Sequence, residues 1–167
     1  FKHLGSKPIF LIVVDNLRYD QWKIIESDIS KIFNIKNDDP YLAILPTTTE
    51  YSRNSLFSGL TPLEMSKKYP ELWDNKSDGF NNKEFDFINK NLERHSLNIK
   101  HSYNKIISHS DGTKFSKKKS DLLKYDLNSI VFNFIDMMSH SSSENMLFKN
   151  LAYDEKSFRS FTSSWFK

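Results

Sequence analysis

With 167 residues, of which 38% are hydrophobic and 14% aromatic, the chain is large enough to bury one substantial core, and its four glycines and five prolines argue against disorder. The longest apolar run, Ile9 to Val14, is too short to span a bilayer, and the absence of cysteine excludes disulfides and thiolate metal sites. The net charge of +3 does not indicate a nucleic-acid-binding protein. We therefore expect a soluble domain in the cytoplasm.

The first predicted element is a strand over residues 9–14, a β-branched run that is typical of a parallel strand buried on both faces. Helical spacing of apolar residues predicts a helix from Tyr19 to Phe33. A second strand is predicted over residues 41–45. A helix from about Glu50 to Ser58 should follow it and end at Gly59, because glycine is the usual residue just beyond a helix C-terminus.

The rest of the chain continues this alternation. Strands are predicted within residues 98–107 and over residues 129–135, and helices are predicted to open at Thr61-Pro62-Leu63-Glu64 and to cover residues 82–97, 116–125 and 153–167. This order predicts an α/β fold, in which a sheet carries helices on both faces and functional residues lie at the carboxyl ends of the strands.

Both ends of the sequence suggest a longer protein. The chain begins without methionine and without a signal peptide. The last predicted helix places Phe158, Phe161 and Trp165 on one face, and no strand follows that could cover it. We therefore expect residues 1–167 to be the N-terminal portion of a domain that continues beyond Lys167, with a further domain before Phe1.

Polar clusters follow the predicted strands: Asp15 after the first, Thr47 to Thr49 after the second, and Asp136 with His140 after the last. Each also has a structural interpretation, because aspartate often caps a turn and Thr47 with Glu50 forms a Thr-x-x-Glu capping box. The capping box does not explain Thr49. Its hydroxyl would lie at the positive end of a helix, where a divalent cation would favour the alkoxide that attacks phosphorus.

Asp136 and His140 stand four residues apart, which would place a carboxylate and an imidazole on one turn of a helix. Oxygen and nitrogen ligands suit zinc or another transition metal ion. The same spacing also fits an exposed hydrogen bond without any metal.

Basic residues cluster at Lys114, Lys117, Lys118 and Lys119, beside Ser116 and Ser120. Such a cluster is typical of a solvated loop or helix start, and less often of a contact with phosphate groups.

Longer motifs resemble those of one protein family. They are Ile-Val-Val-Asp15-Asn-Leu-Arg-Tyr-Asp20, then Leu-Pro-Thr-Thr-Thr49-Glu-Tyr-Ser-Arg-Asn54 with Ser58-Gly59, then Phe-Ile-Asp136-Met-Met-Ser-His140. Together they resemble the PglZ branch of the alkaline phosphatase superfamily over nearly the whole chain. The sequence looks particularly like the PglZ domain of PorX-type proteins of Bacteroidetes, in which a response-regulator receiver domain precedes the phosphoesterase domain.

This resemblance implies a phosphoesterase with two zinc ions. Asp15 would bind one zinc, Asp136 and His140 would bind the other, and Thr49 would be the bridging nucleophile. Related phosphodiesterases place the nucleophile at a fixed distance before the glycine that ends the next helix, which selects Thr49 and leaves Thr48 as the fallback.

Asn54 and Arg18 are the candidates for holding a phosphate oxygen, although either would serve equally well in a surface hydrogen bond. The family pattern also requires an Asp-His pair, usually in an Asp-His-Gly motif, and a late histidine, and neither occurs before Lys167. Either the domain continues or the site is degenerate. The uncovered aromatic face of the last helix favours continuation.

Two other interpretations stay open. The fold could serve as a signalling or interaction module with a degenerate site. The chain could also be a receiver-like signalling domain. Receiver domains, however, have a phosphorylated aspartate after the third strand and paired acids after the first, and neither has a counterpart here. Formylglycine sulfatases form their catalytic residue from a cysteine or serine, and cofactor-independent phosphoglycerate mutases use a serine. Both classes are disfavoured, because this chain has Thr49 at the corresponding place and contains no cysteine.

By resemblance, the substrate would be a phosphodiester such as an oligonucleotide or nucleotide. A sensor histidine kinase and a sigma factor would be partners in control of type IX secretion. The upstream receiver would mediate a homodimer, and no membrane would be involved.

Overall fold

The computed structural model describes residues 7–73, 82–144 and 154–166. The chain divides into two compact units. Residues 1–40 and 101–167 form one, here called the sheet unit, and residues 41–100 form the other, here called the helical unit. Among the described residues, all strands belong to the sheet unit and the helical unit contains only helices.

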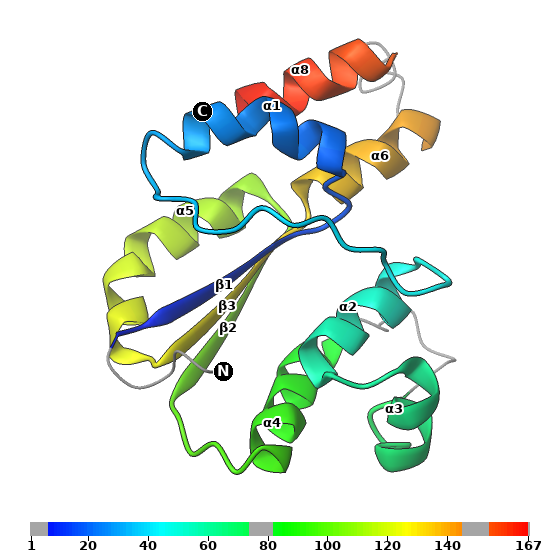
Figure 1. Cartoon of the computed structure of the whole chain (residues 1–167). Helices are drawn as coiled ribbons and strands as arrows, with labels where there is room; N and C mark the ends of the chain where they lie inside the picture. Colours follow the sequence, from blue (N-terminus) through cyan, green and yellow to red (C-terminus); the bar gives the residue numbers. More distant parts are fainter. Residues whose placement is uncertain (1–6, 74–81, 145–153, 167) are drawn as a thin grey trace. The chain divides into compact units, whose positions relative to one another are not determined.

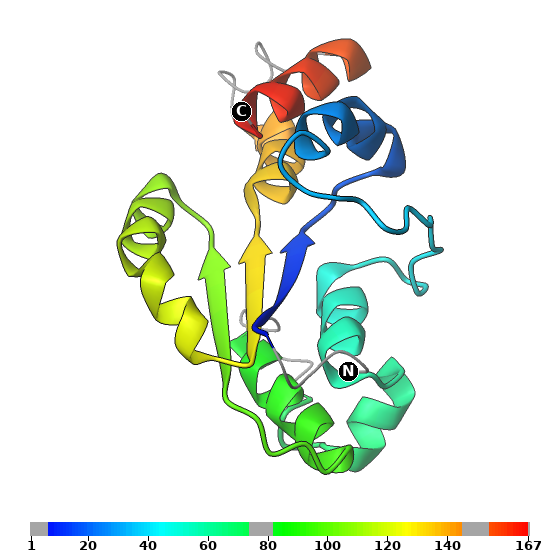
Figure 2. The same ribbon diagram turned by 60° about the vertical axis from the view of Figure 1, so that its left-hand side comes forward.

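The sheet unit is built on the parallel strands β1 (Ile9–Val14), β2 (His101–Ile106) and β3 (Leu127–Phe132), in the spatial order β1-β3-β2 (Figure 1). The last residues of the strands, Val14, Phe132 and Ile106, lie side by side in the register. The carboxyl ends of the strands therefore meet at one end of the sheet (Figure 2), where α/β proteins usually bind ligands.

A helix follows each strand at this end of the sheet. The helices are α1 (Tyr19–Ile29) after β1, α5 (His109–Lys118) with the 3₁₀ helix η2 (Lys119–Lys124) after β2, and α6 (Phe134–Glu144) after β3. Ile106 and Ile130 of the sheet form an apolar cluster with Leu122 of η2, and the partly buried Phe115 and Phe132 pack against it. α5 and η2 thus cover the sheet at β2 and β3.

The last helix, α8 (Glu155–Trp165), packs against α1 (Figure 1). The buried Gln21 amide of α1 donates a 3.1 Å hydrogen bond to the Thr162 hydroxyl of α8. The predicted aromatic face of α8 is present, and Trp165 stacks on Phe134 with ring centroids 4.8 Å apart. This face therefore has partners within the sheet unit, and the continuation of the domain beyond Lys167 stays a prediction.

The helical unit contains α2 (Thr49–Ser58), α3 (Pro62–Lys68) and α4 (Glu84–Arg94). α3 opens at the predicted Thr61-Pro62 signal, and Gly59 ends α2 with a left-handed φ of 65°, as predicted. α2 and α4 pack together through a buried ion pair between Arg53 and Glu84. The Asn91 amide of α4 also donates a 2.9 Å hydrogen bond to the Phe57 carbonyl of α2.

The predicted strand over residues 41–45 is wrong. These residues form no strand, and the side chains of Tyr41 and Leu42 are 83% and 97% exposed. They belong to the helical unit, whose described residues offer no neighbouring strand to pair with. A short apolar run cannot become a strand without such a neighbour, because its backbone N–H and C=O groups need partners.

The prediction that residues 9–14 are buried on both faces is also wrong. β1 pairs only with β3 among the described strands, so it lies at an edge of the sheet. Phe10 is 43% exposed and Ile12 is 55% exposed. The apolar cluster that α5 and η2 help to form includes residues of β2 and β3.

Several boundaries differ from the predicted ones. α1 ends at Ile29 rather than Phe33. The helix expected over residues 116–125 starts earlier, after Ser108, because the Ser108 hydroxyl accepts a 3.1 Å hydrogen bond from the Asp111 N–H and caps α5. β3 ends at Phe132 instead of continuing to residue 135, so Asp136 lies within α6.

Candidate functional site

The turn after β1 is fastened to the helix after β3. The Asp15 N–H donates a 2.9 Å hydrogen bond to the Phe132 carbonyl, which extends the contact between β1 and β3. The next residue, Asn16, has a left-handed φ of 60°, a conformation that asparagine tolerates better than most residues. Its amide donates a 2.9 Å hydrogen bond to the Ser139 hydroxyl of α6. The half-buried Asp15 is thereby held next to the segment that leads into α6.

α6 carries the predicted pair of a carboxylate and an imidazole. Asp136 lies in the first turn of the helix and His140 one turn later. Asp136 Oδ1 and His140 Nε2 are 3.4 Å apart, and the side chains are 18% and 79% exposed. The structure therefore brings these two predicted residues together, with the imidazole open to solvent and the carboxylate largely covered.

The pair fits part of a zinc site. Two ligands that each lie about 2.0–2.2 Å from a tetrahedral zinc ion are about 3.3–3.6 Å apart, and the same separation fits a direct hydrogen bond. Within residues 7–73, 82–144 and 154–166, no group of three or more histidine, aspartate or glutamate side chains could hold a metal ion. Asp136 and His140 are thus two ligands of the three or four that a zinc site requires.

Arg18, a predicted phosphate ligand, contacts carboxylates on two helices. Its Nε lies 3.0 Å from Asp20 Oδ1, and its guanidinium also pairs with Glu155 of α8. Hydrogen bonding to Arg18 lowers the pKa of both carboxyls, and the two carboxylates raise the pKa of Arg18 above its usual value. Arg159 adds a weaker 3.4 Å contact to Asp20. Arg18 therefore connects the N-terminus of α1 to α8.

The predicted nucleophiles belong to the helical unit. Thr48 is the N-cap of α2, its side chain makes no capping hydrogen bond, and Thr49 is the first residue of the helix. The predicted capping box of Thr47 and Glu50 is wrong, because with Thr48 as N-cap the third helical residue is Tyr51. The half-buried Thr49 lies at the helix N-terminus, the position in which the helix dipole favours negative charge on its oxygen.

Asn54 lies on the buried side of α2. Only 3% of its surface is exposed, so the alternative interpretation of Asn54 as a surface hydrogen-bonding residue is wrong. Its neighbour Arg53 forms the buried ion pair with Glu84. A role of Asn54 in holding a phosphate oxygen stays a prediction.

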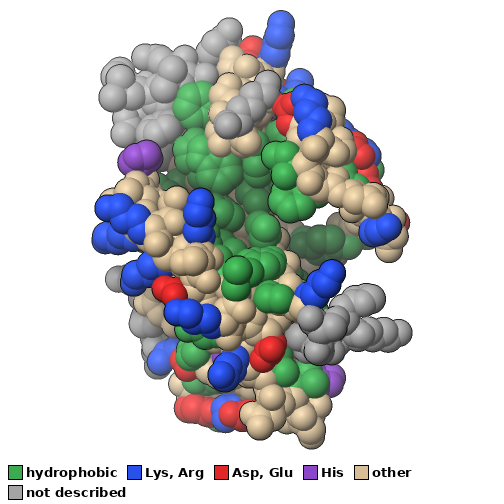
Figure 3. Space-filling view, turned by 90° about the vertical axis from the view of Figure 1, so that its left-hand side faces the viewer, with side chains coloured by type: hydrophobic (Ala, Val, Ile, Leu, Met, Phe, Trp, Pro, Cys, Tyr) green, Lys and Arg blue, Asp and Glu red, His purple; other side chains and the backbone are tan. Residues whose placement is uncertain are grey.

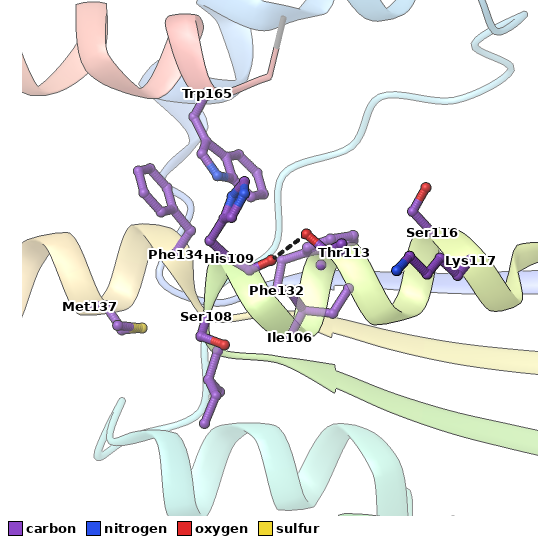
Figure 4. A pocket seen from close by; sticks show the side chains of 12 residues that line it. Ile106, Ser108, His109, Thr113, Ser116, Lys117, Phe132, Phe134, Met137 and Trp165 are labelled. Atoms are coloured by element: carbon purple, nitrogen blue, oxygen red, sulfur yellow. Dashed lines mark hydrogen bonds between the residues drawn. The ribbon is translucent and has the colours of Figure 1, made fainter.

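The sheet unit also contains a cavity of about 750 Å³ that the sequence did not predict. It lies at the carboxyl ends of β2 and β3, where Ile106, Phe132 and Trp165 contribute to its lining (Figure 4). The available signal was the pair Phe132 and Phe134, which places aromatic rings at the end of a strand where α/β sheets bind ligands. No sequence pattern indicates that Trp165 lies beside these two rings, because only the fold brings it there.

A comparison with protein families bears on the identity of the chain. The model of the BREX system PglZ alkaline phosphatase-like domain matches residues 1–165. The chain belongs to this PglZ family. The parallel sheet and the helices of the PglZ chain are consistent with part of an alkaline-phosphatase-like fold.

No curated protein matches this PglZ chain. In the described part of the chain, no helix combines the length and the apolar character needed to cross a membrane.

Proposed function

We propose that this PglZ-family chain belongs to a zinc-dependent phosphoesterase that cleaves phosphodiesters through a threonine nucleophile. The 3.4 Å pairing of Asp136 and His140 on the helix that follows β3 carries this proposal. Membership of an alkaline phosphatase-like family supports a hydrolase that acts on phosphoesters.

Thr49 is the proposed nucleophile, and Thr48 is the fallback. The helix N-terminus at Thr49 favours negative charge on its oxygen. As the Thr49 oxygen bonds to phosphorus, its proton passes to water, and the ester oxygen leaves with the electrons of the broken bond and is protonated to an alcohol. Water then releases the phosphate group from the threonine.

Asp15 is the proposed ligand of one zinc ion, and Asp136 with His140 are the proposed ligands of a second. Bound zinc would supply a Lewis acid that favours the threonine alkoxide and offsets the charge of the phosphate oxygens. We propose that an Asp-His pair and a late histidine beyond Lys167 complete the ligand set.

Arg18 and Asn54 are the proposed phosphate ligands. Arg18 carries the charge and the planar donors that suit a phosphate oxygen, but Asp20 and Glu155 already occupy part of its guanidinium. Binding of phosphate would therefore compete with the contact between α1 and α8.

The wider setting is proposed from the resemblance to PorX-type response regulators of Bacteroidetes. A receiver domain would precede this chain and mediate a homodimer. A sensor histidine kinase and a sigma factor would be partners in cytoplasmic control of type IX secretion, and the substrate would be a nucleotide or oligonucleotide phosphodiester.

One observation favours a second function. No group of three metal-ligating side chains exists within the described residues. A PglZ domain whose metal sites stayed incomplete in the full-length protein would act as a signalling or interaction module of the same fold.

Hydrolysis of a chromogenic phosphodiester by the zinc-loaded, full-length protein separates the two functions. Thr49→Ala should lower kcat by about 10³-fold or more without loss of zinc, because it removes the nucleophile. Thr48→Ala, one residue earlier, is the matched control and should retain most of the activity. The reverse pattern would move the assignment to Thr48. Absence of hydrolysis in the folded, zinc-loaded wild type would support the interaction module.

Zinc content tests the ligands apart from activity. His140→Ala and Asp136→Asn should each lower the number of zinc ions per chain, measured by elemental mass spectrometry after gel filtration. His109→Ala is the matched control, since His109 lies on a different helix, at the start of α5. Equal zinc content in all of these variants would contradict the ligand assignment.

A further inference from the structure

The cavity of the sheet unit is built like a binding pocket for a small molecule. Its volume of about 750 Å³ falls within the range of about 300–1,000 Å³ that is usual for ligand pockets. It opens at the carboxyl ends of β2 and β3, next to α5 and α6. Figure 3 looks onto the side of the molecule that carries α5, and apolar side chains gather near the centre of this view.

One end of the pocket is aromatic. Trp165 and Phe134 stack with their rings almost parallel, at an interplanar angle of 4° and a centroid distance of 4.8 Å. Phe132 meets Trp165 edge to face at 5.7 Å. Figure 4 shows His109 beside this cluster. Phe161 also stacks on Phe134, with ring centroids 6.0 Å apart, and Phe166 meets Trp165 edge to face at 4.8 Å. A planar ring in the pocket would therefore join this cluster edge to face, an arrangement that aromatic pairs favour.

The wall formed by α5 is polar and basic. Thr113, Ser116 and Lys117 line the pocket from this helix, and the Thr113 hydroxyl donates a 3.1 Å hydrogen bond to the His109 carbonyl. Between His109 and Lys117 the helix rises by about 12 Å, so the aromatic end and the lysine are separated along the pocket. Among the residues that the structure describes, the lining contains one lysine, one histidine and no carboxylate. The charge of the pocket therefore favours an anion over a cation.

We propose that this pocket binds a small planar aromatic anion, with the ring against Trp165 and Phe134 and the negative charge toward Lys117. Neither Asp136 nor His140 is among its lining residues, although their helix contributes Phe134 and Met137. Of the predicted basic cluster, Lys117 lines the pocket, whereas Lys118 and Lys119 are not among its lining residues.

Isothermal titration calorimetry with the full-length protein tests the proposal, using 2-naphthoate as the probe and the neutral 2-naphthamide as its uncharged counterpart. We expect saturable binding of 2-naphthoate and about fivefold or more weaker binding of the amide. Lys117→Gln should weaken 2-naphthoate binding by a similar factor. Lys118→Gln removes the same charge from the neighbouring position outside the pocket and should have no such effect.

A second variant tests the cavity itself. A Cβ atom at Gly112 would meet only the Ile106 Cγ2 atom, at 3.9 Å, so Gly112→Leu should fill the pocket and abolish binding, whereas Gly112→Ala should retain it. His140→Ala should bind the probe normally, which separates this site from the proposed phosphoesterase site. The proposal is wrong if the wild type does not bind 2-naphthoate or if the amide binds equally well. It is also wrong if Gly112→Leu binds 2-naphthoate as well as Gly112→Ala does, or if Lys118→Gln weakens binding as much as Lys117→Gln does. An unaltered far-UV circular dichroism spectrum ensures that the variants are folded.

Discussion

The Asn16 amide and the Ser139 hydroxyl form a 2.9 Å hydrogen bond across 123 positions of sequence. This bond joins the turn that carries Asp15 to the helix that carries Asp136 and His140. Ser139 also donates a 3.0 Å hydrogen bond to the Ile135 carbonyl within α6, so its hydroxyl serves both the helix and the turn. The bond from Asn16 to Ser139 therefore links the two segments that carry the proposed ligands of the sheet unit, although neither residue is itself a proposed ligand.

Asn16→Ala should lower the free energy of unfolding by about 1–2 kcal/mol. It removes the hydrogen bond to Ser139 and places alanine in a left-handed conformation, with φ of 60°. Asn16→Gly removes the same bond but adopts this φ freely, so its loss should be smaller by about 1 kcal/mol. Urea denaturation of both variants measures the difference. Equal losses would show that backbone strain at Asn16 is not significant.

The contacts of Arg18 predict a dependence of stability on acid pH. Arg18 lowers the pKa of Asp20 and of Glu155 below their ordinary values of 3.8 and 4.5. A carboxyl group whose pKa is lowered by folding stabilises the protein fully above its unfolded pKa, and this stabilisation is lost as the pH falls through the folded pKa. Below about pH 4.5, the unfolding free energy of the wild type should therefore fall more steeply than that of Arg18→Gln.

Carboxyl ¹³C titrations provide the matching site-specific measurement. In Arg18→Gln, the pKa values of Asp20 and Glu155 should rise toward their ordinary values. Arg159→Gln is the matched control and should raise them less, because Arg159 donates one long hydrogen bond of 3.4 Å to Asp20 and lies 3.9 Å from Glu155, whereas Arg18 donates two hydrogen bonds to each carboxylate. A larger effect of Arg159→Gln would contradict the assigned cause.

The buried ion pair in the helical unit should be costly to break from one side. The side chains of Arg53 and Glu84 are 2% and 0% exposed, so removal of one partner leaves a buried charge that has lost its oppositely charged neighbour. Arg53→Met or Glu84→Gln should each lower the free energy of unfolding by about 3–5 kcal/mol. The double variant should lose clearly less than the sum of the two, and an additive double-mutant cycle would rule out the coupling.

Much of the fold could be predicted because its signals are local. The apolar run at residues 9–14, the Thr61-Pro62 helix start and Gly59 after α2 act within a few residues, and all three were placed correctly. The run at residues 41–45 has the same apolar character but no neighbouring strand among the described residues. Whether Tyr41 and Leu42 join a sheet depends on distant segments, and a local pattern cannot report this.

The candidate site likewise contains one contact that the sequence predicts and others that it does not. The spacing of Asp136 and His140 predicted their contact, because residues four apart meet on a helix. The bond from Asn16 to Ser139 and the ion pairs of Arg18 with α8 join segments more than a hundred residues apart, and no spacing encodes them. The pocket beside Trp165 is of this second kind, because its lining comes from β2, α5, β3, α6 and α8.

The same substitution should have opposite effects at two glycines. Gly59 has a φ of 65°, and an added Cβ would lie 3.2 Å from Arg94 Nη2 and 3.3 Å from Asn91 Nδ2. Arg94 Nη2 donates hydrogen bonds to Asn91 Oδ1 and to the Ser58 carbonyl, and Asn91 Nδ2 donates to the Phe57 carbonyl, so these groups cannot move without loss of these bonds. Gly59→Ala should therefore lower the free energy of unfolding by about 1–2 kcal/mol.

Gly112 lies inside α5, where, among the described residues outside its own helix backbone, an added Cβ would meet the Ile106 Cγ2 atom at 3.9 Å, an ordinary van der Waals distance. Glycine in a helix interior costs about 0.5–1 kcal/mol relative to alanine, because the unfolded chain loses more freedom on folding. Gly112→Ala should therefore raise the free energy of unfolding by about that amount. Parallel urea titrations of both variants test the pair. A loss of stability for Gly112→Ala would mean that the space beside Ile106 is narrower than the structure shows, and would also weaken the case for an open pocket.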